Sequence, residues 1–340
     1  MRKKIVRIEL YHTFFKDNAI NELFETHGYE VEEYAFFKEE KKRFLTKKEY
    51  IRREMVCLLK LIFKLKDLRN NKILCLGGYY STLLMCRLFS FLLGSNFHLY
   101  IYNFYIHEAG EKEMVKKILQ FLLHNRKLTL IVQSPQEVAY YKALTDAPVH
   151  FVPYCADPAN NNADRPEQVP EQEYIFTGGY TNRDYALMIA LAELFPDRCF
   201  VFAVSGLNTE VFRQPLPDNI HIYKDIPKAH FDWLLGHAAI VIAPLKKDVG
   251  ASGQMLCIGA MQNKKPVVYS NISAINYYFT SETGIAYEIN NLQSLQTGLQ
   301  ALLQNPQKRK EIGEAAFEKY KNKFTTICRN RALFNIINNF

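Results

Sequence analysis

Short apolar runs that alternate with helical stretches constrain the fold of this chain more than any other feature. In the first half, each run rich in Val, Ile, Leu, Phe and Tyr is followed by a segment whose apolar residues recur at helical spacing. Strands separated by helices are typical of βαβ units and a parallel sheet. We expect strands at 4–11, 30–36, 72–76, 97–105, 128–132 and 149–152, with helices at 18–26, 48–68, 81–93, 111–125 and 135–144.

The second half repeats this alternation after a break. Residues 156–172 are rich in Pro, Asn and acidic residues and have no apolar period, which predicts a linker between domains at 1–155 and 173–324. A further helix is expected at 325–340. The other elements expected in this half are strands at 174–176, 199–204, 220–222, 240–243, 266–269 and 286–289, and helices at 183–194, 229–236, 253–262, 292–304 and 308–322.

The length, the first apolar run and the cysteines limit which class of protein this chain can belong to. A chain of 340 residues suits two domains of ordinary size. Arg7 and Glu9 interrupt the first apolar run, so we expect a strand there and not a signal peptide, and no transmembrane helix elsewhere. The seven cysteines form no CxxC pair, which favours buried thiols in a reducing compartment over a disulfide framework or a zinc site.

Residues 250–268 combine a loop of small residues, a short helix and a buried strand. Ser252 and Gly253 stand where the helix would begin, and a helix N-terminus offers free backbone N–H groups and a partial positive charge. The expected apolar face of the helix consists of Met255, Leu256, Ile258 and Met261. This pattern predicts an anion site at the carboxyl edge of a parallel sheet, although such a loop also occurs as a plain connection.

The same segment resembles the donor-binding signature of GT-B glycosyltransferases, in which Ser-Gly-Gln and a following Ala-Met-x-x-x-Lys-Pro-Val run frame the nucleotide sugar. Residues 174–185 are similar to the opening of the donor domain in these enzymes, and residues 238–245 to the strand before the signature. The resemblance implies an α/β fold of GT-B type, with two Rossmann-like doubly wound domains facing across a cleft and the last helix returning to the first domain. The alternation alone also fits one large doubly wound sheet or a periplasmic-binding type of protein.

The resemblance implies a nucleoside-diphosphate sugar of UDP or GDP type as donor, and no cofactor. Gly178 and Gly179 would let the backbone approach the diphosphate, and Arg183 would bind it bidentately. The alternative for Arg183 is an exposed arginine at a helix start, paired with Asp184. Lys247 either adds positive charge or is a solvated loop lysine.

Two further groups of donor residues follow from the resemblance. The loop after the strand at 220–222 contacts the nucleobase in the family, which assigns Tyr223 and Ile226 to this role, and an ordinary surface turn is the alternative. The residues assigned to the donor at the start of the signature helix are Ser252, Gly253, Gln254 and Met255.

The chain departs from the family at two positions. Retaining GT-B enzymes usually carry two glutamates eight positions apart around the signature, and here these positions are Ala251 and Gly259. An inverting reaction would instead need a general base in the first domain. The candidates follow expected strands: His107 with Glu108, and His12, with a structural role as the alternative for each histidine.

The net excess of positive charge comes from one segment. Residues 38–72 hold 13 basic and 5 acidic residues, and their net charge of +8 equals that of the whole chain. Because apolar residues recur at helical spacing within this basic segment, Lys38–Lys72 predicts contact with an anionic membrane surface. The alternative is a core helix with a solvated outer face. No recognisable nucleic-acid-binding module is present, so we expect no nucleic acid partner.

The resemblance implies a metal-independent glycosyltransferase of hexosyltransferase type, and the basic segment predicts that it is cytoplasmic and peripheral at the inner face of the cell membrane. Its acceptor would be a glycan or a lipid-linked molecule in bacterial surface polysaccharide or lipopolysaccharide assembly. A catalytically inactive GT-B scaffold or partner subunit, and a sugar-nucleotide epimerase of the same fold, are the alternatives. The sequence has no HExxH, Walker A or Asp-x-Asp motif and no GxGxxG after a strand, so we expect no metal site, P-loop or classical dehydrogenase site.

Overall fold

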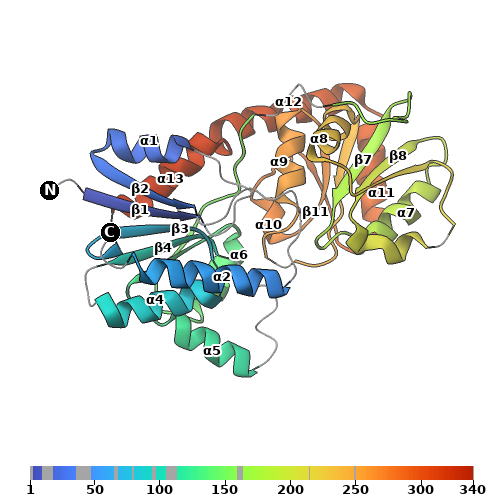
Figure 1. Ribbon diagram of the computed structural model, residues 1–340. Helices are drawn as coiled ribbons and strands as arrows, with labels where there is room; N and C mark the ends of the chain where they lie inside the picture. The colour runs from blue at the N-terminus through green and yellow to red at the C-terminus, as the bar shows by residue number, and fades with distance from the viewer. Residues whose placement is uncertain are drawn as a thin grey trace. The chain divides into compact units, whose positions relative to one another are not determined.

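The computed structural model divides the chain into two compact units (Figure 1). One comprises Met1–Pro153 together with Arg329–Phe340, and the other comprises Tyr154–Cys328. The structure describes residues 3–9, 18–35, 47–64, 68–78, 80–93, 97–104, 113–158, 164–213, 215–248 and 250–339. Within these ranges, no helix is both long enough and apolar enough to cross a membrane.

The first unit is built on a parallel sheet in the order β2-β1-β3-β4-β5-β6. Its central strands are buried on both faces and are therefore rich in apolar residues, whereas Arg7 interrupts the apolar run of the first strand. The strands are β1 (Lys3–Glu9), β2 (Tyr29–Ala35), β3 (Lys72–Gly78), β4 (His98–Phe104), β5 (Leu128–Val132) and β6 (Val149–Phe151). The helices that follow the chain between them are α1 (Asn18–Thr26), α2 (Lys47–Ile62), α4 (Tyr80–Leu93), α5 (Glu113–Leu123) and α6 (Pro135–Lys142).

Helices cover both faces of this sheet. One face packs against α2, α4 and α5, which contribute Cys57, Leu61, Phe89 and Leu119 to its core, and these helices lie side by side on that face (Figure 1). The other face packs against α1 and α13 (Thr326–Asn338), the last helix of the chain. Aromatic contact of Phe24 with Phe334, at 5.3 Å between ring centroids, belongs to this second core.

The second unit repeats the architecture with a parallel sheet in the order β12-β11-β10-β7-β8-β9. Its strands are β7 (Tyr174–Gly179), β8 (Cys199–Val204), β9 (Ile220–Lys224), β10 (Ile240–Ala243), β11 (Val267–Ser270) and β12 (Ile285–Tyr287). Its helices are α7 (Tyr185–Glu193), α8 (Lys228–His237), α9 (Gln254–Gln262), α10 (Ser273–Asn276), α11 (Leu292–Leu303) and α12 (Pro306–Lys323), with a 3₁₀ helix at Gly206–Phe212. Segment 164–172, part of the expected linker, is grouped with this unit.

Several expected element boundaries differ from the structure, and three of them have a clear local reason. The helix expected at 48–68 ends at Ile62, because the chain turns at Phe63 and Lys64, where the Lys64 N–H donates to the Leu61 carbonyl. The helix expected from Arg183 begins at Tyr185, because the Asp184 side chain accepts from the Leu187 N–H and caps it. The strand expected to end at residue 176 continues to Gly179, paired with β8 throughout.

Candidate functional site

The order of strands in the second unit defines where a ligand would bind. From β7 the chain proceeds to β8 and β9 on one side, and β10, β11 and β12 then lie on the other side. Open parallel sheets bind ligands outside the carboxyl ends of the strands, at the point where the strand order reverses. In this sheet that point lies between the loop after β7, residues 180–184, and the loop after β10, residues 244–253.

Asn182 joins these two loops. Its side-chain Nδ2 donates to the Lys247 carbonyl at 2.7 Å and to the Ser252 Oγ at 3.1 Å, while its Oδ1 accepts from the Lys247 N–H at 3.1 Å. Backbone bonds run beside it, from the Lys246 N–H to the Asn182 carbonyl and from the Asp184 N–H to the Pro244 carbonyl. Asn182 has a φ of 56°, a left-handed conformation that asparagine tolerates better than most residues. The two loops therefore form one connected structure.

Arg183 lies beneath the turn and is 8% exposed. Its Nε donates to the Gly178 carbonyl at 2.8 Å and its Nη1 to the Thr181 carbonyl at 2.9 Å. Burial lowers the pKa of the guanidinium, and among the described residues no carboxylate is one of the groups whose charge acts on it. The alternative of an exposed arginine paired with Asp184 is wrong. A buried cation without a carboxylate partner is costly, and an anionic ligand would compensate it.

Packing within the protein explains why glycine occupies both Gly178 and Gly179 at the end of β7. A Cβ on Gly179, whose φ is +119°, would lie 2.6 Å from the Arg183 Nη2. A Cβ on Gly178 would lie 2.5 Å from the ring of Phe231, which packs edge-on against Phe176. The strand end is therefore shaped around the guanidinium on one side and around an aromatic ring on the other.

The start of α9 has the expected form, with one correction. Gly253, at φ +83°, precedes the helix, and a Cβ there would lie 2.9 Å from the Leu245 Cδ1. Ser252 and Gln254 are buried, whereas Met255 is 50% exposed and does not share the buried face of Leu256, Ile258 and Met261. The first turn holds no acidic residue that would compete with an anion for the backbone N–H groups.

The remaining charged candidates of the second unit lie at its surface. Lys246 and Lys247 are exposed beside the site, although the backbone of Lys247 is held by Asn182. The strand β9 lies two strand spacings, or about 10 Å, from β7, and the loop assigned to the nucleobase follows it. In that loop the Tyr223 hydroxyl donates to the Gln168 carbonyl at 3.0 Å, and Ile226 is partly buried.

The two positions that depart from the family pattern also belong to this unit. Ala251 is half-buried in the loop before α9. Gly259 lies within α9, where a Cβ would come 3.2 Å from the Leu235 Cδ1. Neither residue supplies a side chain that accepts a hydrogen bond.

The candidates for a catalytic base, His12, His107 and Glu108, lie outside the described residues. The nearest described strands end at Glu9, in β1, and at Phe104, in β4. In the first unit the strand order reverses between β1 and β3, so the carboxyl end of β1 borders the ligand-binding edge of that sheet.

A comparison with protein families finds a match within the second unit. Residues 207–319 match the family model of glycosyl transferases group 1. This match includes β9, the β10–α9 loop and α9, and it confirms the interpretation of the chain as a glycosyltransferase. No curated protein matches the sequence significantly.

Solved structures show the same fold over nearly the whole chain. Sucrose-phosphate synthase from Thermosynechococcus elongatus is 14% identical with a TM-score of 0.70, and the match covers 99% of each chain. HepE from Anabaena, solved in complex with UDP, is 15% identical with a TM-score of 0.68, covering 99% of this chain and 100% of that one. A glycosyltransferase from Rickettsia africae is 15% identical with a TM-score of 0.60, covering 99% and 98%. The expected GT-B fold class, with its two doubly wound sheets, is confirmed.

Proposed function

We propose that this protein is a metal-independent glycosyltransferase of hexosyltransferase type. It moves a sugar from a nucleoside-diphosphate sugar of UDP or GDP type to a glycan or lipid-linked acceptor. The group 1 family match supports the reaction class. The structures of HepE with UDP and with UDP-glucose support a nucleotide sugar as the donor class.

The observation that carries this proposal is the buried Arg183 guanidinium at the carboxyl end of β7, which has no carboxylate partner in the part of the chain that the structure describes. A diphosphate placed between Gly179 and the start of α9 would supply the missing negative charge. The positive end of the α9 dipole at Gln254 and the ammonium of Lys247 would add to its binding. The same groups would stabilise the charge that develops on the departing diphosphate, so the protein itself provides the cations that a metal would otherwise supply.

The reaction also needs the acceptor hydroxyl to lose a proton. His107, with Glu108, and His12 remain our candidates for the general base, because each follows a strand of the first unit. Tyr223 and Ile226 remain the candidates for contact with the nucleobase.

We further propose that the protein acts in bacterial surface polysaccharide or lipopolysaccharide assembly, in the cytoplasm at the inner face of the cell membrane. Lys38–Lys72 would hold it there, and nucleic acid is not among the proposed partners. Of this segment the structure describes residues 47–64 and 68–72, where α2 carries Lys48, Arg52 and Lys60 on its exposed surface.

An assay of nucleoside diphosphate release tests the activity. We expect release from one nucleotide sugar when a matching glycan or lipid-linked acceptor is added, and its loss in the His107→Ala variant. Ala251 and Gly259 motivate the second candidate, an inactive scaffold. Binding of a nucleotide sugar without release, across acceptors extracted from bacterial envelopes, would favour the scaffold over the enzyme.

We expect Asn182→Gly to weaken nucleoside diphosphate binding about tenfold, because the variant loses the three side-chain hydrogen bonds that hold Lys247 and Ser252 in place. Glycine tolerates the left-handed backbone at this position, so the thermal stability should change little. The measurements are titration calorimetry and a thermal melt. Asn219→Ala is the control, because it also removes an asparagine side chain from this unit. The Asn219 side chain donates to three backbone carbonyls far from the site, so we expect its loss to lower stability and leave the affinity unchanged. Unchanged affinity in Asn182→Gly would show that the loop does not depend on this side chain.

A further inference from the structure

The first unit presents large apolar side chains to solvent from α2, α4 and α5. Phe63, in the turn after α2, is 88% exposed, and Phe91 on α4 is 86% exposed. On α5, Met114 is 73% exposed and Phe121 is 66% exposed. More than half of the exposed large apolar side chains among the described residues belong to these three helices and this turn. We call the outward side of α2, α4 and α5, with Phe63, the three-helix face.

The exposed side chains recur at helical spacing. Met55 and Leu59 precede Phe63 at intervals of four residues, and Ile118 lies between Met114 and Phe121. The opposite sides of the same helices already bury residues in the core of the unit. Each helix therefore has two apolar sides, and folding of this unit accounts for only one of them.

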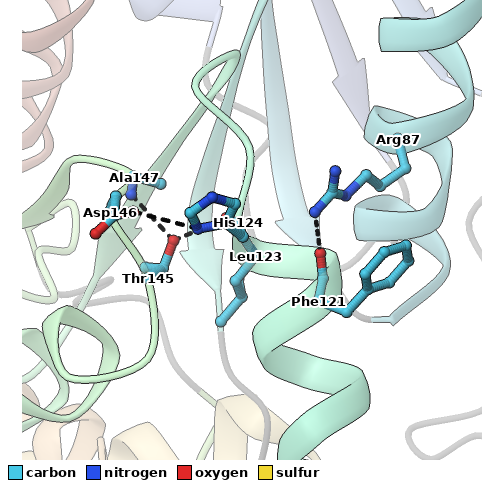
Figure 2. Close-up of polar contacts among 7 residues, drawn as sticks. All are labelled: Arg87, Phe121, Leu123, His124, Thr145, Asp146 and Ala147. Carbon is cyan, nitrogen blue, oxygen red and sulfur yellow. Dashed lines mark hydrogen bonds and ion pairs between the residues drawn. The ribbon is translucent and has the colours of Figure 1, made fainter.

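The three phenylalanines lie at corresponding places on neighbouring helices. Helices that connect parallel strands run against the strand direction, so the C-terminal ends of α2, α4 and α5 lie toward the amino edge of the sheet. Phe63, Phe91 and Phe121 all lie near these ends. Figure 2 shows Arg87 reaching from α4 to α5, where its guanidinium carbon lies 4.6 Å from the Phe121 ring centroid and its Nη2 donates to the Phe121 carbonyl.

The segments that form this face carry an excess of basic residues. Residues 47–64, 80–93 and 113–123 together hold nine basic and three acidic residues. Lys48, Arg52 and Lys117 are among the exposed ones. Exposed apolar side chains flanked by Lys and Arg are the pattern of a surface that lies in the interface of an anionic bilayer. A second copy of the same face is disfavoured as the partner, because a symmetric contact would bring two positive surfaces together.

We propose that the three-helix face docks on an anionic lipid bilayer and inserts Phe63, Phe91 and Phe121 among the lipids. This inference deepens the proposed membrane contact. It extends the contact from Lys38–Lys72 to α4 and α5, and it assigns the apolar part to three named side chains. The vesicle test below requires no nucleotide, so its failure is distinguishable from failure of the proposed transferase activity.

The test is flotation of the full-length protein with vesicles of phosphatidylcholine, with and without phosphatidylglycerol. We expect binding to the anionic vesicles that weakens as salt is added. Each of Phe63→Ser, Phe91→Ser and Phe121→Ser should reduce the partition coefficient about tenfold, and the triple variant should lose binding. Replacing Lys48, Arg52 and Lys117 with glutamine should reduce it about fivefold for each charge removed, on anionic vesicles only.

Matched controls separate docking from general loss of apolar surface. Leu194→Ser and Ile327→Ser remove exposed side chains, 46% and 58% exposed, that lie outside the three-helix face, and they should bind vesicles as the unchanged protein does. The triple phenylalanine variant should keep its thermal melt and its nucleotide binding, because the replaced side chains are exposed. If the triple variant unfolds, vesicle binding by the single Phe91→Ser variant is the test.

Insertion itself is measured by fluorescence. The chain has one tryptophan, Trp233 in the second unit, so Phe91→Trp in a Trp233→Phe background reports on α4 alone. We expect a blue shift on anionic vesicles and quenching by lipids brominated on their acyl chains. Equal vesicle binding by the triple variant, no binding by the unchanged protein, or a dimer that the triple variant abolishes without any vesicle binding would each overturn the proposal.

Discussion

Replacing Arg183 with glutamine should lower the affinity for the preferred nucleoside diphosphate about 100-fold. Glutamine can still donate to the Gly178 or Thr181 carbonyl, so the turn keeps part of its internal bonding. The variant loses the positive charge, which no described carboxylate balances, and with it the strongest attraction for a diphosphate. Titration calorimetry with the nucleotide that binds best measures the change.

Lys246→Ala is the matched control for this variant. It removes a cation from the same sheet edge, but one that is exposed to solvent and screened. We expect a change of less than about threefold, as for other solvated charges. Equal losses of affinity in Arg183→Gln and Lys246→Ala would mean that only the general positive potential of the sheet edge matters. Such a result would contradict the assignment of Arg183 to the diphosphate.

The second large effect concerns stability. Gly313 lies in α12 where this helix crosses the chain after α9, and a Cβ there would lie 2.0 Å from the Lys264 carbonyl oxygen. Because the obstacle is backbone, the two segments must move apart. We expect Gly313→Ala to lower the free energy of unfolding by about 3 kcal/mol and the melting temperature by several degrees.

Gly298→Ala controls for the change of glycine to alanine within a helix of the same unit. Its Cβ would meet only the side-chain methyl groups of Ile285 and Val268, each at 3.2 Å, and these can give way. We expect little net destabilisation, because alanine also favours the helix. A thermal melt that moves equally in both variants would show that the α12 crossing is not as close as described.

The fold was largely predictable because it depends on a local pattern. Strands buried on both faces, such as β8 and β10, are continuous apolar runs, and the helix at Asn18–Thr26 is found with its expected bounds. Where the predicted end of a helix was wrong, a capping contact or a turn determines the observed end. Asp184 moves the start of α7, and the turn at Phe63 ends α2 before the apolar spacing in the sequence does.

The site was predictable only in part. Gly253 and the start of α9 follow from the small residues of the loop. The role of Asn182 does not, because its partners Lys247 and Ser252 are more than sixty residues away in sequence. Arg183 was identified as a candidate, but its burial was not, because the guanidinium packs against Gly179, where a Cβ would lie 2.6 Å from its Nη2. The exposed phenylalanines of α4 and α5 were also missed, because α4 is apolar on most sides and its period does not separate the faces.

The central claim is that the second unit binds a nucleoside-diphosphate sugar at the edge formed by β7 and the start of α9. Titration calorimetry of the full-length protein with UDP, GDP, CDP, ADP and their common sugars, in the presence of a metal chelator, tests it most directly. The account predicts that UDP or GDP, and a sugar derivative of the same nucleotide, bind and compete for one site. Absence of binding by every nucleotide, with and without chelator, would contradict it.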